Sequence, residues 1–229
     1  MSLSDYIKNS SSKAKNNMKE LPFINGITVF IKDPLPDDIN IKNVLSILRK
    51  NIPHHLFSGV DVIYVGQFKN LKTKSFNAAF MDGAMYLSNE QISEEDMIDD
   101  FVHELAHAVE EISNFGFYTD EEISDEFYMK RMKLKEILQA NGYDVSKQNF
   151  ENLEYDEKFD FYLYEEIGYP ALTTLTVNLF CSPYGATSIR EYFANAFENF
   201  FMKEPRYVKK LSPKVYNKIV LLSKEDYFY

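Results

Sequence analysis

The residue types best suited to chemistry gather in one short stretch, Phe101–Val109. This stretch contains the pattern His-Glu-x-x-His, formed by His103, Glu104 and His107. On an α-helix, residues four positions apart share a face, so both imidazoles can bind one zinc ion. Glu104 would then take a proton from the attacking water. The pattern predicts a zinc-dependent hydrolase, and a solvated polar helix face is the alternative.

The residues around this stretch predict the helix that must carry it. Ser93-Glu-Glu-Asp96 has the pattern of a capping box at a helix start. An apolar stripe then recurs at helical spacing, and the two histidines lie off it. The stripe consists of Ile98, Phe101, Val102, Leu105, Val109 and Ile112. We therefore expect the aliphatic face to be buried and the histidines to be available for binding.

The residues before this helix predict a small sheet and one further helix. The β-branched stretches Ile27–Ile31 and Val60–Val65 favour strands. Two more strands, Ala78–Met81 and Ala84–Ser88, form a hairpin through Asp82-Gly83. Between the first two strands, the spacing of Ile41, Val44, Leu45 and Leu48 predicts a helix that is capped by Asp37 or Asp38 and ended by Pro53.

Helices dominate the remainder of the chain. They are expected at Glu121–Ala140, near 156–167, at Ile189–Met202 and from Pro213 to Leu222, with an apolar segment at 170–180. We predict an α+β fold in which a small mixed sheet packs on the His-Glu-x-x-His helix, before a mainly helical C-terminal lobe. Residues 1–20 are expected to form a flexible arm. Residues 21–229 are expected to form one domain, with an N-lobe at about 21–114 and a C-lobe at about 115–229.

Composition excludes several functional classes. The net charge of −10 argues against a nucleic-acid-binding protein, and the basic cluster Lys203–Lys210 is interpreted as solvated surface. A single cysteine, Cys181, excludes an internal disulfide and a cysteine-based zinc site. No apolar run has membrane-spanning length, and the first residues lack a signal-peptide core. We expect a cytoplasmic or phage-associated protein that neither binds nor crosses a membrane.

A catalytic zinc site needs a third protein ligand besides the two histidines. No histidine follows His107, and His54 and His55 lie far upstream in an expected loop. A carboxylate must therefore complete the site. Glu126 has the spacing known from zinc aminopeptidases. Glu121 lies in an acidic stretch that locally resembles the third-ligand stretch of thermolysin-type enzymes, although its spacing from His107 is too short. Both residues also suit a charged helix start, where the helix dipole favours acidic side chains.

The third carboxylate candidate is Glu191, within Tyr-Gly-Ala-Thr-Ser-Ile-Arg-Glu-Tyr-Phe-Ala-Asn-Ala-Phe at 184–197. Together with His-Glu-Leu-Ala-His-Ala-Val-Glu at 103–110, this segment resembles the anthrax-lethal-factor-like metallopeptidases. That group includes the Pro-Pro endopeptidases and phage-encoded or bacterial relatives. The resemblance implies a zincin-like fold of the gluzincin type. It also implies one Zn²⁺ held by His103, His107 and Glu191, with Tyr184 facing the substrate.

The helical spacing of this second motif also predicts roles for its residues independently of the family. Glu191 and Asn195 are four positions apart on one polar stripe, so Asn195 could hydrogen-bond a metal ligand. The family often has Glu where Asn195 stands. The alternative role for Glu191 is a capping box with Ser188 as the first residue.

The resulting hypothesis is a zinc-dependent endopeptidase acting on a peptide or protein. Glu104 would be the general base, and Tyr184 would donate to the oxyanion. The strand residues Ala84, Met85 and Tyr86 are expected at a sheet edge, where an extended substrate can pair; an internal strand is the alternative.

Two other functions remain open. One is an aminopeptidase that uses Glu126 as the third ligand. The other is a zinc-binding structural or virion-associated protein of the same fold without activity. Without a visible signal peptide, a cytoplasmic or phage-associated protein is expected.

Overall fold

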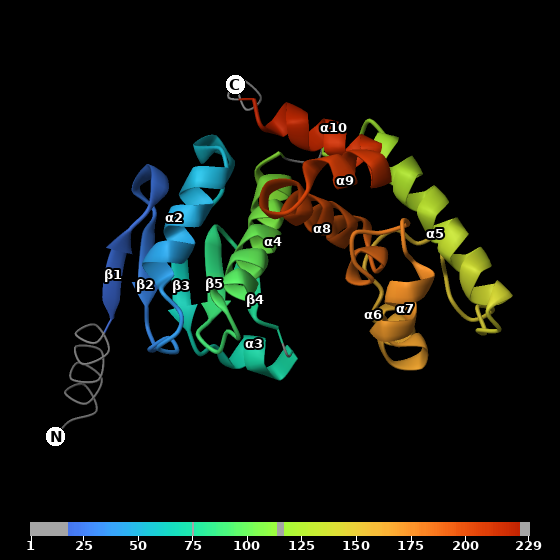
Figure 1. The fold of residues 1–229 in the computed structure, drawn as a ribbon, viewed down its shortest axis with the longest axis horizontal. Helices are drawn as coiled ribbons and strands as arrows, with labels where there is room; N and C mark the ends of the chain where they lie inside the picture. Colours follow the sequence, from blue (N-terminus) through green and yellow to red (C-terminus); the bar gives the residue numbers. More distant parts are fainter. Residues whose placement is uncertain (1–17, 75, 114–116, 225–229) are drawn as a thin grey trace. The chain divides into compact units, whose positions relative to one another are not determined.

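The computed structural model describes residues 18–74, 76–113 and 117–224. Its contacts divide the chain into two compact units, one ending at Ile112 and one beginning at Ser113. We call them the N-terminal and C-terminal units. The N-terminal unit contains the sheet of the described chain and the C-terminal unit is helical (Figure 1). The prediction of a mixed α+β protein with a small sheet is confirmed.

The sheet of the N-terminal unit has five strands in the order β1-β2-β3-β5-β4. They are β1 (Lys19–Pro22), β2 (Thr28–Ile31), β3 (Val62–Gly66), β4 (Ala78–Met81) and β5 (Ala84–Ser88). The three central strands, β2, β3 and β5, are parallel, whereas β1 and β4 pair antiparallel at the two edges. The sheet is therefore mixed, as predicted.

One face of the sheet forms the core of the N-terminal unit. Val29, Ile63 and Met85 lie in one row across β2, β3 and β5, and each is 0% exposed. Helices α2 (Ile41–Asn51) and α4 (Glu94–Ile112) cover this face (Figure 1). Because strand side chains alternate between faces, the next row, Phe30, Tyr64 and Tyr86, lies on the opposite face, and its rings stack across the strands.

The β4–β5 hairpin turns as the sequence predicts. Asp82 and Gly83 have φ values of 52° and 76°, the positive values that a two-residue type I′ turn requires. A Cβ atom at Gly83 would lie 2.5 Å from the Asp61 carboxylate, so a larger residue there would also have to displace that side chain. The turn fixes the register of β4 against β5.

The structure corrects several local predictions. The arm predicted for residues 1–20 is wrong at its end, because Lys19 begins β1; residues 1–17 lie outside the described ranges. The α2 helix begins at Ile41 with Asn40 as its cap, rather than at Asp37 or Asp38. Glu94 accounts for this start, because its carboxylate accepts hydrogen bonds from the Asn40 amide and the Asn43 side chain. The short helix α3 (Lys69–Lys74) was not predicted.

The C-terminal unit consists of helices around a buried aromatic core. They are α5 (Glu122–Ala140), α6 (Glu157–Phe161), a π-helical turn at Tyr162–Ile167, α7 (Tyr169–Leu175), α8 (Ile189–Met202), α9 (Pro205–Leu211) and α10 (Pro213–Leu222). The α8 bounds match the prediction, whereas α9 occupies the basic cluster that was interpreted only as surface.

The α8 helix lies at the centre of the C-terminal unit, in contact with α5, α9 and α10. Phe193 and Phe197 are fully buried, and Tyr192 stacks on Phe127 of α5 with 5.1 Å between ring centroids. None of the helices in the described ranges combines the length and apolarity needed to cross a bilayer.

Candidate functional site

The α4 helix presents the His-Glu-x-x-His residues as predicted. It starts after Ser93, whose hydroxyl accepts a hydrogen bond from the Asp96 amide at 3.0 Å. The apolar face is buried, whereas His103, Glu104 and His107 are only partly buried. The hydrophobic contacts of α4 therefore fix the opposite face and leave these three polar side chains accessible.

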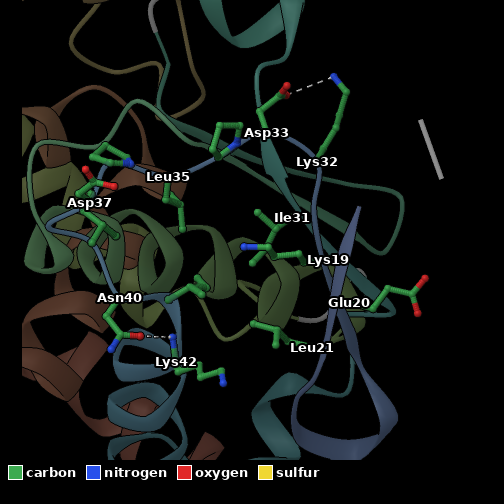
Figure 2. A pocket seen from close by; sticks show the side chains of 14 residues that line it. Lys19, Glu20, Leu21, Ile31, Lys32, Asp33, Leu35, Asp37, Asn40 and Lys42 are labelled. Carbon is green, nitrogen blue, oxygen red and sulfur yellow. Dashed lines mark hydrogen bonds and ion pairs between the residues drawn. The ribbon is translucent and has the colours of Figure 1, made fainter. Parts of the chain in front are cut away.

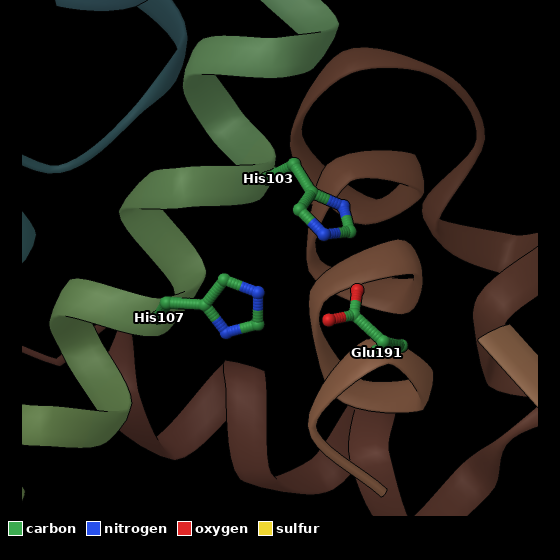
Figure 3. A group of neighbouring side chains, drawn as sticks. All are labelled: His103, His107 and Glu191. Carbon is green, nitrogen blue, oxygen red and sulfur yellow. The ribbon is translucent and has the colours of Figure 1, made fainter. Parts of the chain in front are cut away.

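The structure brings His103 and His107 together on one face of α4 (Figure 3). Their ring centroids are 5.1 Å apart and their ring planes are inclined by 80°. Each side chain offers one imidazole nitrogen as a ligand atom. This arrangement follows from helical spacing and suits two ligands of one ion.

Glu110 orients His107, a role that the sequence analysis missed. The Nδ1 atom of His107 lies 2.9 Å from Oε2 of Glu110, whose side chain is only 6% exposed. Because a carboxylate only accepts hydrogen bonds, Nδ1 carries the proton and Nε2 keeps its lone pair for a metal. The spacing of three residues between His107 and Glu110 on one helix could have indicated this contact from the sequence.

Replacing Glu110 with alanine is expected to weaken zinc binding about 10- to 100-fold, because His107 loses the partner that fixes its tautomer and its ring orientation. Competition with a chelating dye measures this affinity. Glu111→Ala is the matched control, since Glu111 is the exposed neighbour on the same helix. Equal affinities for the two variants would contradict the orienting role of Glu110.

Glu104 is held by the edge of the sheet. The backbone amide of Phe80 in β4 donates a hydrogen bond of 2.6 Å to Oε2 of Glu104. Phe80 belongs to the edge strand, where alternate amides point away from the sheet and need another acceptor. The side chain of Glu104 thus has a fixed position next to the two imidazoles.

The prediction that Ala84, Met85 and Tyr86 form a sheet edge is wrong. They belong to β5, which pairs with β3 on one side and β4 on the other. Both sides of β5 are therefore occupied, and Met85 is 0% exposed. The hairpin folds back so that β4, the earlier strand, becomes the edge beside α4. The available main-chain groups lie on Ala78–Met81.

Asp100, one turn before His103 on α4, has an altered acidity. Burial raises the pKa of its carboxyl group to about 6, against the opposing effects of a hydrogen bond from Gln91 and the nearby His103. Glu104 and Asp96 raise it further. The Oε1 atom of Gln91 is buried and has no hydrogen-bond partner among the described residues. Compared with the unfolded chain, the folded protein therefore shifts Asp100 toward its protonated form.

Replacing Asp100 with asparagine is expected to stabilise the metal-free protein at neutral pH. Between pH of about 4 and about 6, the folded state binds more protons than the unfolded state, so the free energy of unfolding of the wild type falls as pH rises. Asparagine is neutral and can also donate to Gln91. The expected gain is about 2 kcal/mol at pH 8 and near zero at pH 4.

Urea unfolding between pH 4 and 8, with a chelator present, measures the effect of this substitution. Asp99→Asn, on the neighbouring residue of the same helix, is the control. A difference between Asp100→Asn and wild type that does not vary with pH would contradict the raised pKa.

In the C-terminal unit, Glu191 lies in the first turn of α8 (Figure 3). The hydroxyl of Ser188 caps this helix by accepting a hydrogen bond from the Glu191 amide at 3.3 Å. This bond uses the backbone of Glu191 and not its carboxylate. Glu191 is half-buried and offers one carboxylate oxygen as a ligand atom. The cap and a ligand role are therefore compatible.

Tyr184 begins a short 3₁₀ turn, Tyr184–Ala186, that precedes α8. The charge of the Glu191 carboxylate acts on the Tyr184 phenol. Burial raises the pKa of its phenol well above the usual value, and the Glu191 carboxylate raises it further. Burial also raises the pKa of Tyr169, with further contributions from Asp160 and Glu191. Asp160 lies in this neighbourhood as well, and burial followed by Glu191 raises its pKa. Tyr184 therefore keeps its proton at neutral pH and can act as a donor.

Asn195 holds the loop that carries Tyr184. Its side-chain oxygen accepts a hydrogen bond from the hydroxyl of Ser182. Asn195 is 5% exposed and packs against Gly185. This contact gives Asn195 a defined structural role next to Tyr184, whereas the prediction that it orients a metal ligand stays a prediction.

The other predicted ligands have different surroundings. Both carboxylate oxygens of Glu126 are used inside the C-terminal unit, where they accept from the Tyr192 hydroxyl at 2.9 Å and the Lys214 amide at 3.0 Å. Glu121 is exposed and precedes α5 with a φ of 58°. His54 and His55 lie in a 3₁₀ turn at His54–Phe57. Glu126 therefore has a structural role at the start of α10.

A separate hollow of about 1100 Å³ lies in the N-terminal unit, between β1 and the loop before α2 (Figure 2). Lys19, Ile31, Asp33 and Leu35 are among the side chains that line it. Charges of both signs and apolar groups are mixed there, and the lining contains neither histidine of α4. It gives no indication of a particular ligand.

Comparisons with known proteins add no family to this geometry, since no family model, curated protein or solved structure matches the chain.

Proposed function

We propose that the protein is a zinc-dependent endopeptidase whose metal is held by His103, His107 and Glu191. The observation that carries this proposal is that α4 combines two neighbouring imidazoles, His103 and His107, with the carboxylate of Glu104, which the Phe80 amide holds in place. Glu191, the proposed third ligand, offers a carboxylate oxygen from the C-terminal unit.

The donor set fits zinc by its chemistry. Two neutral imidazoles and one carboxylate are the ligands of many catalytic zinc sites, which leave a further position for water or substrate. Glu110 supplies the carboxylate that typically supports a zinc-binding histidine. When bound, zinc supplies a Lewis acid for hydrolysis of an amide bond.

Glu104 and Tyr184 have complementary roles in the proposed reaction. Glu104 accepts the proton of the attacking water and later delivers it to the leaving amine. The Phe80 amide keeps the Glu104 carboxylate in place during both transfers. Tyr184 is protonated at neutral pH, as an ordinary tyrosine is, and burial raises its pKa further, so its hydroxyl can donate to the carbonyl oxygen as negative charge develops there.

A peptide is the proposed substrate because β4 is an exposed strand edge beside Glu104. An extended peptide can pair with those outward-facing main-chain groups of Ala78–Met81 that do not bind Glu104. Met81, the last residue of this strand, is 53% exposed and offers an apolar contact for a substrate side chain. The proposed substrate edge thus replaces the β5 residues named from the sequence.

Incubation of the zinc-loaded protein with a diverse peptide library tests this function, with cleavage products identified by mass spectrometry. We expect internal cleavage that a chelator abolishes and added zinc restores. Removal of single N-terminal residues would instead indicate an aminopeptidase. Zinc binding without any cleavage would favour a structural or virion-associated protein, and both results would contradict the proposal.

A further inference from the structure

Arg131 is a buried cation that the proposed reaction does not use. It lies in the middle of α5 and is only 1% exposed. Burial lowers the pKa of its guanidinium to about 10, while Asp156 acts in the opposite direction. Burying a charged group is unfavourable unless hydrogen bonds compensate for the lost water, so its contacts indicate what the charge is for.

The guanidinium of Arg131 binds backbone carbonyl groups on two loops. Its Nη1 donates to the carbonyl oxygens of Ala186 and Thr187, at 3.1 and 3.2 Å. Its Nη2 donates to the carbonyl oxygen of Asn149 at 3.3 Å. The Nε atom has no hydrogen-bond partner within the described ranges. The charge is therefore directed mainly at the backbone just before α8.

Aromatic rings hold the guanidinium in this orientation. Its central carbon lies 3.8 Å from the ring centroid of Phe159, and the rings of Phe127 and Phe150 lie at 5.5 and 5.9 Å. Such cation–π contacts are strongest when water is excluded. The group is therefore confined by packing as well as by hydrogen bonds.

Two of the three carbonyls that Arg131 binds, those of Ala186 and Thr187, lie between Tyr184 and Glu191. Other contacts hold the same segment: the Thr187 hydroxyl donates to the Tyr184 carbonyl at 2.7 Å, and the Ile189 amide donates to the Leu153 carbonyl at 2.8 Å. Arg131 binds this segment from the core side and links it to the loop at Asn149. Movement of Ala186 or Thr187 would move both Tyr184 and Glu191.

We propose that Arg131 is a positioning residue that fixes the segment from Tyr184 to Glu191 by binding the carbonyls of Ala186 and Thr187. A residue that only filled the core would stabilise the whole C-terminal unit without a particular effect on this segment. The two roles therefore differ in which part of the protein shows increased local unfolding when Arg131 is replaced.

Hydrogen exchange of Arg131→Met, read by mass spectrometry, separates these roles. We expect exchange in peptides covering 184–191 to accelerate at least about tenfold, while peptides of α10 change little, because unpaired carbonyls favour local opening. Phe150→Leu is the matched control, since it removes part of the same aromatic enclosure and no hydrogen bond to the segment. Equal acceleration in the two variants, or none in Arg131→Met, would overturn the proposal.

A second variant, Arg131→Gln, covers the case in which Arg131→Met does not fold. Arg131→Gln keeps one donor group, so we expect a smaller acceleration that is still confined to 184–191. Acceleration spread evenly over the C-terminal unit in this variant would count against positioning.

Zinc affinity gives a further readout, which rests on the proposed function. Arg131→Met, or Arg131→Gln in its place, is expected to bind zinc about tenfold more weakly than Phe150→Leu does, because Glu191 is no longer held. If the wild type binds no zinc, the proposed function fails, but the exchange measurement still decides the role of Arg131.

Discussion

Replacing Glu104 with glutamine is expected to lower the rate of peptide hydrolysis by about 10²- to 10⁴-fold, because an amide cannot accept the proton of the attacking water. The amide oxygen of glutamine can still accept the hydrogen bond from Phe80, so the side chain should keep its place. Zinc affinity is therefore expected to change little. Turnover of a library-derived peptide and dye competition for zinc measure the two quantities.

The control for this substitution is Glu111→Gln, which removes a carboxylate from an exposed position of the same helix. It is expected to retain the turnover and zinc affinity of the wild type. Turnover by Glu104→Gln above about one tenth of the wild-type value would be incompatible with Glu104 as the general base.

The second large effect is expected for Glu191. Zinc sites in peptides bind with roughly 10 kcal/mol or more, so the loss of one of three protein ligands should weaken binding on the order of 10²-fold or more. The cap of α8 uses the backbone amide of Glu191, so Glu191→Gln should leave the helix and the fold intact. Dye competition gives the affinity, and circular dichroism reports the fold.

Glu126→Gln is the matched control for Glu191→Gln. Glu126 accepts hydrogen bonds from Tyr192 and Lys214, so this substitution is expected to reduce stability while leaving zinc affinity unchanged. The opposite pattern, with zinc lost in Glu126→Gln and retained in Glu191→Gln, would show that the third ligand has been assigned to the wrong residue.

Local signals in the sequence were sufficient for the elements that carry the candidate residues. The apolar stripe predicted α4, and the predicted bounds of α8, Ile189 and Met202, agree with the structure. Asp82-Gly83 predicted the hairpin because few residue pairs adopt two successive positive φ values. These features depend on periodicity, capping and turn chemistry, which act over a few residues.

Features that depend on contacts between residues far apart in the sequence could not be predicted from such local signals. The sequence shows that β4 and β5 form a hairpin but not which of them pairs with β3, and the edge strand was therefore assigned to the wrong one. Arg131 has no local pattern that indicates burial against two loops. By contrast, the His107–Glu110 pair follows from helical spacing and could have been predicted.

The central claim is that one zinc ion binds His103, His107 and Glu191. Diffraction data collected at the zinc absorption edge, from crystals grown with one equivalent of zinc, test it most directly. We predict one anomalous peak per chain, at about 2.0–2.2 Å from one nitrogen of each imidazole and a carboxylate oxygen of Glu191. A peak that lacks either histidine, or that has Glu126 or Glu121 as its carboxylate ligand, would contradict the claim.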